Sequence, residues 1–185
     1  MTSHLPVLLA VLLAALAFCL PARAGDDWAA VKSGTAVLFR HALAPGVGDP
    51  PGFLLGDCST QRNLSDEGRA QARRLGKAFT AQSIRVGAVW SSLWCRTRET
   101  ADIAFPQRRL DQPAFNSFFG QPDAAPEQTQ AARALLSQWR GPGVLVVVTH
   151  QVNITALTGV VPASGEGVVV RSTAQGLEVV GRVSP

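Results

Sequence analysis

Three short apolar runs, separated by segments of helical periodicity, constrain the fold of this chain most strongly. The runs are residues 35–39, 86–90 and 144–148, and all three are rich in β-branched or aromatic side chains. Such runs are typical of strands that are buried on both faces, as in a parallel sheet covered by helices. The alternation of strands and helices therefore predicts an α/β fold, a three-layer sandwich with a largely parallel central sheet flanked by helices.

The segments between the runs carry the signals of helices. Over residues 65–82, Ala72, Leu75 and Phe79 repeat at helical spacing, and Ser65 is a suitable N-cap. Further helices are expected over residues 95–104, 127–139 and 152–157, and a C-terminal hairpin over residues 167–172 and 177–183. The helix over 127–139 should carry Ala131, Leu135 and Trp139 on one apolar face, whereas the proline-containing segment 106–125 is expected to form loops.

The N-terminus has the pattern of a secretory signal peptide. Residues 7–20 form an unbroken apolar stretch, which is shorter than the roughly 20 residues that a membrane-spanning helix needs. Ala22 and Ala24 form a small-residue cleavage site, so we expect residues 1–24 to be removed. The alternative is an uncleaved membrane anchor. With cleavage, residues 25–185 form a single periplasmic or secreted domain with no stable membrane anchor.

Charge and cysteine content narrow the class of protein further. The net charge of +4 is too small, and the basic residues too dispersed, to indicate nucleic-acid binding. After cleavage two cysteines remain, Cys58 and Cys95, and an oxidising compartment would permit a disulfide between them. A pair of free buried thiols is equally compatible with the sequence.

Two histidines and two arginines follow the apolar runs at the point where each strand should end. Arg40 and His41 follow the first run, His150 follows the third, and Arg96 lies shortly after the second. Ligands of open α/β sheets bind at the carboxyl ends of the strands, so these side chains are expected to form one cationic pocket, with no carboxylate partner. Arginine forks suit phosphoryl oxygens, a neutral imidazole can attack phosphorus, and a protonated one can stabilise developing charge.

Two competing chemistries fit the sequence poorly. The two histidines and two cysteines lack the close paired spacing of a zinc site. A cysteine-based phosphatase needs five residues between its cysteine and arginine, but only three separate Cys58 from Arg62, and Cys95 directly precedes Arg96.

Four segments resemble, in order, the motifs of the histidine phosphatase superfamily, which has the phosphoglycerate-mutase-like fold. They are LFRHA at 38–42, NLSDEGRAQA at 63–72, VWSSLWCRTRETA at 89–101 and VVTH at 147–150. The resemblance implies that His41 is the phosphorylated nucleophile and that Arg40, Arg96 and His150 complete the phosphate pocket. Asn63 and Ser92 are secondary candidates for phosphate binding. The family needs neither a metal nor an organic cofactor.

The chain departs from the family at the residue that protonates the leaving group. Asn116 and Gln151 occupy the two positions where the branches of the family carry this general acid. Asp57, Asp111 and Asp123 are conceivable substitutes, and nothing in their spacing selects one of them. General acid catalysis contributes about 10²–10⁴-fold, so we expect slow hydrolysis of alkyl phosphates or a substrate with a good leaving group.

The chain is similar to short exported members of the family, one group of which acts on lipopolysaccharide core phosphate. The expected partner is therefore a phosphorylated small molecule or an envelope glycolipid. Phe115, Phe118 and Phe119 could contact an apolar substrate, although anchoring of a loop to the core is the favoured interpretation. The alternative function is a non-catalytic protein that binds phosphorylated ligands on the same fold.

Overall fold

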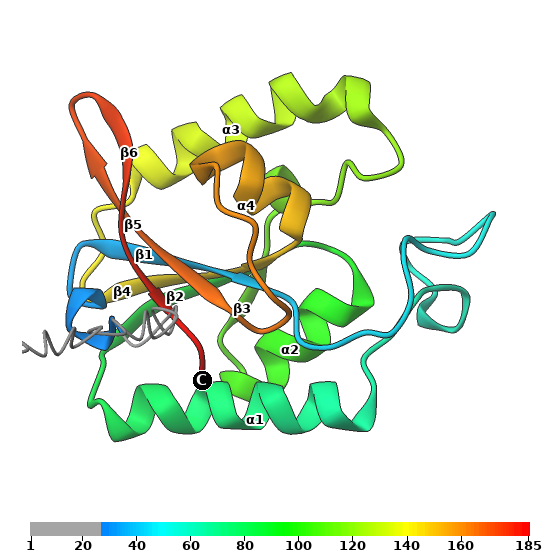
Figure 1. Cartoon of the computed structure of the whole chain (residues 1–185), viewed down its shortest axis with the longest axis horizontal. Helices are drawn as coiled ribbons and strands as arrows, with labels where there is room; N and C mark the ends of the chain where they lie inside the picture. The colour runs from blue at the N-terminus through cyan, green and yellow to red at the C-terminus, as the bar shows by residue number, and fades with distance from the viewer. Residues whose placement is uncertain (1–26) are drawn as a thin grey trace, which may run out of the picture.

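The computed structural model describes residues 27–185, which form one mixed sheet with helices on both faces (Figure 1). The expected signal peptide, residues 1–24, lies outside the described residues. The strands are β1 (Thr35–Arg40), β2 (Val86–Ser91), β3 (Arg109–Asp111), β4 (Val144–Thr149), β5 (Gly167–Thr173) and β6 (Gly176–Val183). The α-helices are α1 (Asp66–Ala81), α2 (Cys95–Ala104), α3 (Ala125–Gln138) and α4 (Gln151–Thr158). Short 3₁₀ turns occupy Trp28–Ala30, Cys58–Thr60, Pro113–Phe115 and Pro122–Ala124.

The sheet has the strand order β3-β2-β4-β1-β5-β6. The first four strands in this order are parallel, whereas β5 and β6 are antiparallel to their neighbours. The α/β class and the largely parallel sheet predicted from the sequence are therefore confirmed. The C-terminal hairpin is confirmed as well, as the pair β5 and β6.

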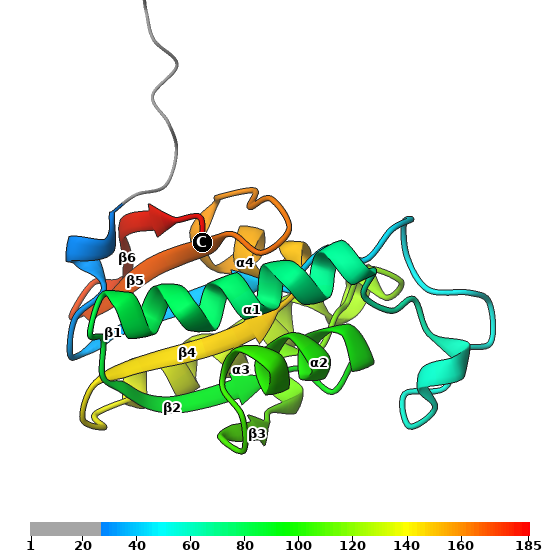
Figure 2. The same ribbon diagram turned by 90° about the horizontal axis from the view of Figure 1, so that it is seen from below.

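Alternating residues of the strands build two separate cores. Val37 and Phe39 of β1 pack with α1 and α2, and Ala36 and Leu38 pack with α3 and α4 on the opposite face. Figure 1 shows α3 and α4 above the sheet and α1 below it, and Figure 2 shows α1 and α2 together on the near face. Strand β4 is buried along its whole length because both of its faces are covered.

The helix signals of the sequence correspond closely to observed helices. The Ser65 side chain accepts a hydrogen bond from the Gly68 backbone N–H and caps α1. Gly159 ends α4 with a φ of 75°, a left-handed conformation that glycine adopts without steric cost. Ser65 therefore sets where α1 begins, and Gly159 sets where α4 ends.

Two expectations about the 106–139 region were wrong. Residues 106–125 contain β3, which pairs with the edge of β2, in addition to loops. This strand is three residues long and mostly exposed, so it carries no apolar pattern. In α3 the buried residues are Ala132 and Leu136, while Ala131 is exposed. Leu135 and the neighbouring Trp139 pack only at the border of the core.

The first and last described elements are joined. The Asp27 backbone N–H donates to the Arg182 carbonyl at 3.1 Å, and the Arg182 N–H donates to the Asp27 carboxylate at 3.0 Å. The edge of β6 is therefore partly covered near its end. Within residues 27–185, no helix combines the length and apolarity needed to cross a bilayer.

Candidate active site

The candidate site lies at the carboxyl ends of β1, β2 and β4. Sheet register pairs Arg40 with Thr149, and Ser91 with Val148, so the three strands end at the same level. The next residues along the chain enter a cavity of about 510 Å³. Arg40, His41, Arg96 and His150 all line it, so the structure brings together the four residues that the sequence placed in one pocket.

His41 is held as a neutral imidazole with one defined tautomer. Its Nδ1 lies 2.8 Å from the Ala42 carbonyl oxygen, which can only accept, so Nδ1 carries the proton and Nε2 carries the lone pair. The side chain is buried, and burial together with the nearby Arg96 charge lowers its pKa to about 3. The nitrogen that can attack an electrophile is therefore available at neutral pH.

His150 faces His41, with the two ring centroids 5.6 Å apart. Its Nε2 hydrogen bonds to Ser92 Oγ at 2.8 Å, and its Nδ1 lies 3.5 Å from Arg96 Nη2. Burial, and then the proximity of His41 and Arg96, lowers the pKa of His150 well below its ordinary value. The lowered pKa favours the neutral form of the His150 ring at neutral pH.

Asp49 supplies a carboxylate that sequence reasoning missed, and the expectation of a pocket without one was wrong. Arg96 Nη1 donates to Oδ1 at 2.7 Å and Nη2 to Oδ2 at 3.1 Å, and both side chains are almost fully buried. Trp94 Nε1 and the Arg62 backbone N–H each donate to the same carboxylate at 3.0 Å. Burial alone would raise the pKa of Asp49, but these hydrogen bonds and the Arg96 charge lower it.

Arg62 is a third pocket arginine that sequence reasoning did not select. It lines the cavity, with its Nε donating to the Gly48 carbonyl at 2.7 Å and its Nη1 to the Ala44 carbonyl. Three arginines, one carboxylate and two neutral imidazoles give the lining a net charge of about +2. The Nε atoms of Arg40 and Arg96 are also buried without a hydrogen-bond partner among the described residues. Both features suit a dianionic oxyanion.

The secondary candidates Asn63 and Ser92 do not line the cavity. The Asn63 side chain donates to the Cys58 and Gln61 carbonyls and so fixes the turn between them. Ser92 is buried and contacts His150, which makes it a residue that orients the imidazole. Phosphate contact by Asn63 is therefore not supported by its position.

The proposed substitutes for the general acid are all outside the cavity lining. Asp57 caps a 3₁₀ turn, Asp111 pairs with two arginines at the end of β3, and Asp123 is exposed. Of the two family acid positions, Gln151 lines the cavity, whereas the Asn116 side chain accepts from the Leu93 N–H. Among the lining residues, Asp49 is the only carboxylic acid, and its lowered pKa keeps it ionised.

Of the three phenylalanines in the loop after β3, two anchor the loop to the core and one lines the cavity. Phe115 and Phe118 are buried and anchor the loop to the core, as favoured from the sequence. Phe119 is 56% exposed and lines the cavity. Phe53 and Trp94 join it there, with their ring centroids 5.8 Å apart.

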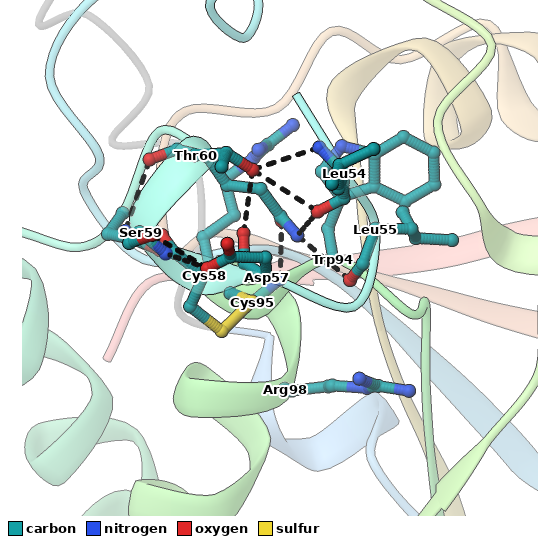
Figure 3. The surroundings of a disulfide bond; sticks show 12 residues. Leu54, Leu55, Asp57, Cys58, Ser59, Thr60, Trp94, Cys95 and Arg98 are labelled. Carbon is teal, nitrogen blue, oxygen red and sulfur yellow. Dashed lines mark hydrogen bonds between the residues drawn. A yellow bond between two sulfur atoms is a disulfide. The ribbon is translucent and has the colours of Figure 1, made fainter. Parts of the chain in front are cut away.

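A disulfide joins Cys58 and Cys95, with their Cα atoms 5.6 Å apart (Figure 3). It ties the loop of residues 42–62, which projects from the sheet in Figures 1 and 2, to the first residue of α2. Gln61 adds one hydrogen bond across the same junction, from the Cys95 N–H, and two within the loop, to the carbonyls of Leu54 and Leu55. The loop that supplies Asp49 and Arg62 is thereby fixed beside Arg96.

The Asp49 carboxylate, which pairs with Arg96, should stabilise the folded protein and should reduce the positive charge of the cavity. We expect Asp49→Asn to lower the free energy of unfolding by about 2 kcal/mol, because hydrogen bonds to charged groups are lost in a buried setting. The same change should tighten inorganic phosphate binding, since it removes a negative charge from the pocket. Urea unfolding and calorimetry would measure the two effects. Asp123→Asn, which neutralises an exposed acid, is the control, and equal stability of the two variants would contradict the prediction.

The low pKa of His41 predicts a pH-dependent stability. The unfolded histidine titrates near 6.5 and the folded one near 3, so between these values the unfolded chain binds more protons. The free energy of unfolding should therefore fall as the pH falls, by about 2 kcal/mol from His41 between pH 7 and pH 5. Urea titrations of the wild type and His41→Asn at both pH values would measure it. A pH dependence that is identical in the two proteins would exclude this contribution.

Within residues 27–185, no group of three or more histidine, cysteine or acidic side chains is arranged to hold a metal ion. What remains is an α/β fold whose parallel strands present two neutral imidazoles among arginines. This arrangement suits the binding of a phosphoryl group beside a neutral imidazole.

Comparison with known proteins gives one family match, over part of the chain. Residues 38–114 match the family model of the histidine phosphatase superfamily, branch 1. The match contains His41, Arg62 and Arg96, whereas His150 lies beyond it. No curated protein sequence matches the chain.

Solved structures of phosphatases have the same fold. The protein histidine phosphatase SixA, solved with tungstate, matches with a TM-score of 0.57, 14% identity, and 82% and 97% of the two chains covered. The alpha-ribazole phosphatase of Shigella flexneri matches with a TM-score of 0.58 and 15% identity, over 82% of this chain and 96% of that chain. Phosphoserine phosphatase of Entamoeba histolytica, in complex with 3-phosphoglyceric acid, matches with a TM-score of 0.59 and 12% identity, over 82% of this chain and 97% of that chain. The chain is therefore similar to the histidine phosphatase superfamily in the sequence of residues 38–114, and it has the fold of these solved phosphatases.

Proposed function

We propose that this protein is a phosphatase that hydrolyses a phosphomonoester through a phosphohistidine at His41, without a metal. The observation that carries the proposal is the neutral His41 imidazole, whose Nε2 lone pair lies in a cavity with a net charge of about +2. A bound phosphate dianion would balance that charge. Arg40, Arg62 and Arg96 line the cavity and are the side chains that we assign to the phosphoryl oxygens.

The reaction has two displacement steps. His41 Nε2 attacks phosphorus, the bond from phosphorus to the ester oxygen breaks, and the alkoxide or phenoxide takes a proton from water. Water then attacks the phosphohistidine, which releases inorganic phosphate and restores the imidazole. The Ala42 carbonyl holds the Nδ1 proton throughout and stabilises the positive charge that develops on the phosphorylated ring.

His150 and Ser92 have orienting roles in this proposal. Arg96 Nη2 can only donate, so His150 Nδ1, 3.5 Å away, is the acceptor and His150 Nε2–H donates to Ser92 Oγ. Ser92 Oγ uses its other lone pair to accept from the Trp94 backbone N–H at 3.3 Å. In this neutral tautomer His150 fixes the Arg96 guanidinium at the wall of the cavity.

The lack of a general acid in the cavity lining shapes the expected activity. Asp49 is ionised and bonded to Arg96, so it is a poor proton donor. Esters with basic alkoxide leaving groups should therefore turn over slowly, by the factor of about 10²–10⁴ that general acid catalysis contributes.

We propose further that the protein is exported and acts in the periplasm or outside the cell. The apolar segment before residue 24 and the Cys58–Cys95 disulfide support this, because disulfides persist in oxidising compartments. An envelope phosphate such as that of lipopolysaccharide core is the substrate that the sequence resemblance suggests, and we propose no nucleic-acid partner.

A non-catalytic phosphate-binding protein is the second candidate. One observation favours it: Asp49 occupies both terminal nitrogens of Arg96, the fork expected to hold a transferred phosphoryl group. A binding protein would tolerate this pairing, and it would need no leaving-group acid.

An assay with p-nitrophenyl phosphate in the presence of EDTA tests the proposal. The leaving group needs little protonation, so the missing acid does not hide turnover. Rapid acid-free quenching with labelled substrate should trap a base-stable, acid-labile phosphoenzyme, as expected for phosphohistidine. Metal-independent turnover with this adduct supports the phosphatase. Tight vanadate binding without turnover favours the binding protein instead.

A further inference from the structure

Apolar and aromatic side chains surround the opening of the cavity. Val47, Phe53, Trp94 and Phe119 line it, and we call these four residues the aromatic mouth. Val47 is 86% exposed and Phe119 is 56% exposed, although both are apolar. Exposed apolar side chains gathered at a pocket commonly mark a ligand-binding surface.

The aromatic mouth is continuous with the two catalytic-site imidazoles. The Trp94 ring packs edge-on against His150 with centroids 5.3 Å apart, and Phe53 packs against Trp94. Figure 3 shows the indole of Trp94 beside the loop that carries Leu54 and Leu55. An aromatic wall therefore leads from the floor of the cavity, where phosphorus would lie, to its opening.

Phe119 reaches the aromatic mouth from a different segment of the chain. Phe119 lies in the loop after β3, and a Cβ on Gly48 would be 3.6 Å from its ring, so the ring packs against the Gly48 backbone. Asp49, the next residue, accepts the Trp94 Nε1–H and fixes the indole. The mouth is thus held by contacts to the same loop that supplies the pocket carboxylate.

From these features we propose that the substrate is a small phosphate ester of a phenol, whose aromatic ring lies in the aromatic mouth. The proposal rests on the phosphatase function proposed above and specifies its substrate class. A phosphorus atom at His41 Nε2 requires the leaving group to extend toward the opening, where planar rings are the available partners. The cavity of about 510 Å³ accommodates a small molecule.

The chemistry of the site leads to the same class independently. A phenoxide departs without full protonation because the ring delocalises its charge, whereas a sugar alkoxide needs an acid. No lining residue supplies that acid, since Asp49 is ionised. An aromatic leaving group therefore removes the need for the residue that the site lacks, and it disfavours the sugar phosphate of lipopolysaccharide core.

Four esters separate ring recognition from leaving-group acidity. 2-Naphthyl phosphate has both a ring and an acidic alcohol, and phenyl phosphate has a smaller ring. Trifluoroethyl phosphate has an acidified alcohol without a ring, and glucose 6-phosphate has neither property. We expect the specificity constant kcat/KM to fall in that order, with the naphthyl ester ahead of the trifluoroethyl ester by about tenfold or more.

Two variants locate the effect. Phe119→Ala should raise KM for the naphthyl ester about tenfold and leave the trifluoroethyl ester unchanged. Leu110→Ala is the matched control, because Leu110 is apolar, 57% exposed and outside the cavity lining. Phe53→Ala tests a second ring of the aromatic mouth and should raise KM for the naphthyl ester, as Phe119→Ala does.

The outcomes distinguish this proposal from the function on which it rests. Turnover with a phosphoenzyme but no preference for rings, or a preference for glucose 6-phosphate, would overturn the aromatic substrate and leave the phosphatase intact. Equal effects of Phe119→Ala on the naphthyl and trifluoroethyl esters would overturn it too. Failure of all four esters together with an absent phosphoenzyme would overturn the phosphatase itself.

Discussion

His41→Ala should lower kcat/KM for p-nitrophenyl phosphate by about 10⁴-fold or more, because it removes the nucleophile of the first displacement step. The arginines of the cavity are untouched by this change, so inorganic phosphate and vanadate should still bind. Steady-state kinetics with the aryl ester and calorimetry with vanadate would measure the two effects separately.

The control for this variant is another residue of the same cavity. Gln121 lines the opening and is exposed, and Gln121→Ala should change kcat/KM by less than about threefold. If His41→Ala retained more than about one hundredth of the activity, the nucleophile would lie elsewhere. Loss of vanadate binding with intact thermal unfolding would instead assign His41 to ligand binding.

Removal of the Cys58–Cys95 disulfide should produce the largest loss of stability. The bond closes a loop with a sequence separation of 37, and the chain-entropy model assigns such a loop about 4 kcal/mol. In a domain of this size that loss corresponds to a fall in melting temperature of about 10 °C. Thermal unfolding of the wild type and the Cys58→Ser/Cys95→Ser double variant would measure it.

The same double variant tests whether the bond also organises the site. Its melting temperature should not respond to dithiothreitol, whereas that of the wild type should fall to the same value. Because the loop carries Asp49 and Arg62, the reduced protein should also bind phosphate less tightly. Two free thiols in protein purified from an oxidising compartment would contradict the presence of the bond in solution.

The sequence predicted the part of the site that follows buried strands. His41 and His150 come directly after runs whose burial is decided by local composition, and parallel strands bring their carboxyl ends to one edge. The helix over α1 was equally predictable, since Ser65 and the apolar spacing act within a few residues. These features depend on short-range patterns that a single sequence records.

The sequence did not predict the contribution of the loop between β1 and α1. Asp49 is held in the cavity by Arg96 and Trp94, which lie in another segment of the chain. Arg62 is held by the carbonyl of Gly48, which lies in an irregular part of the same loop. No periodicity marks such positions, because glycine and proline turns carry the chain there. The register of α3 was missed for a related reason, since packing against the sheet chose Ala132 over its neighbour Ala131.

The pairing of Asp27 with Arg182 makes the described chain nearly a closed circle. A short linker would join those ends with little change in the backbone conformation. New ends could be opened at the exposed β5–β6 turn near Gln175. Both ends would then lie far from the loops that form the cavity. The architecture is thus suited to circular permutation, and a permuted protein would separate the order of the segments along the chain from their arrangement in space.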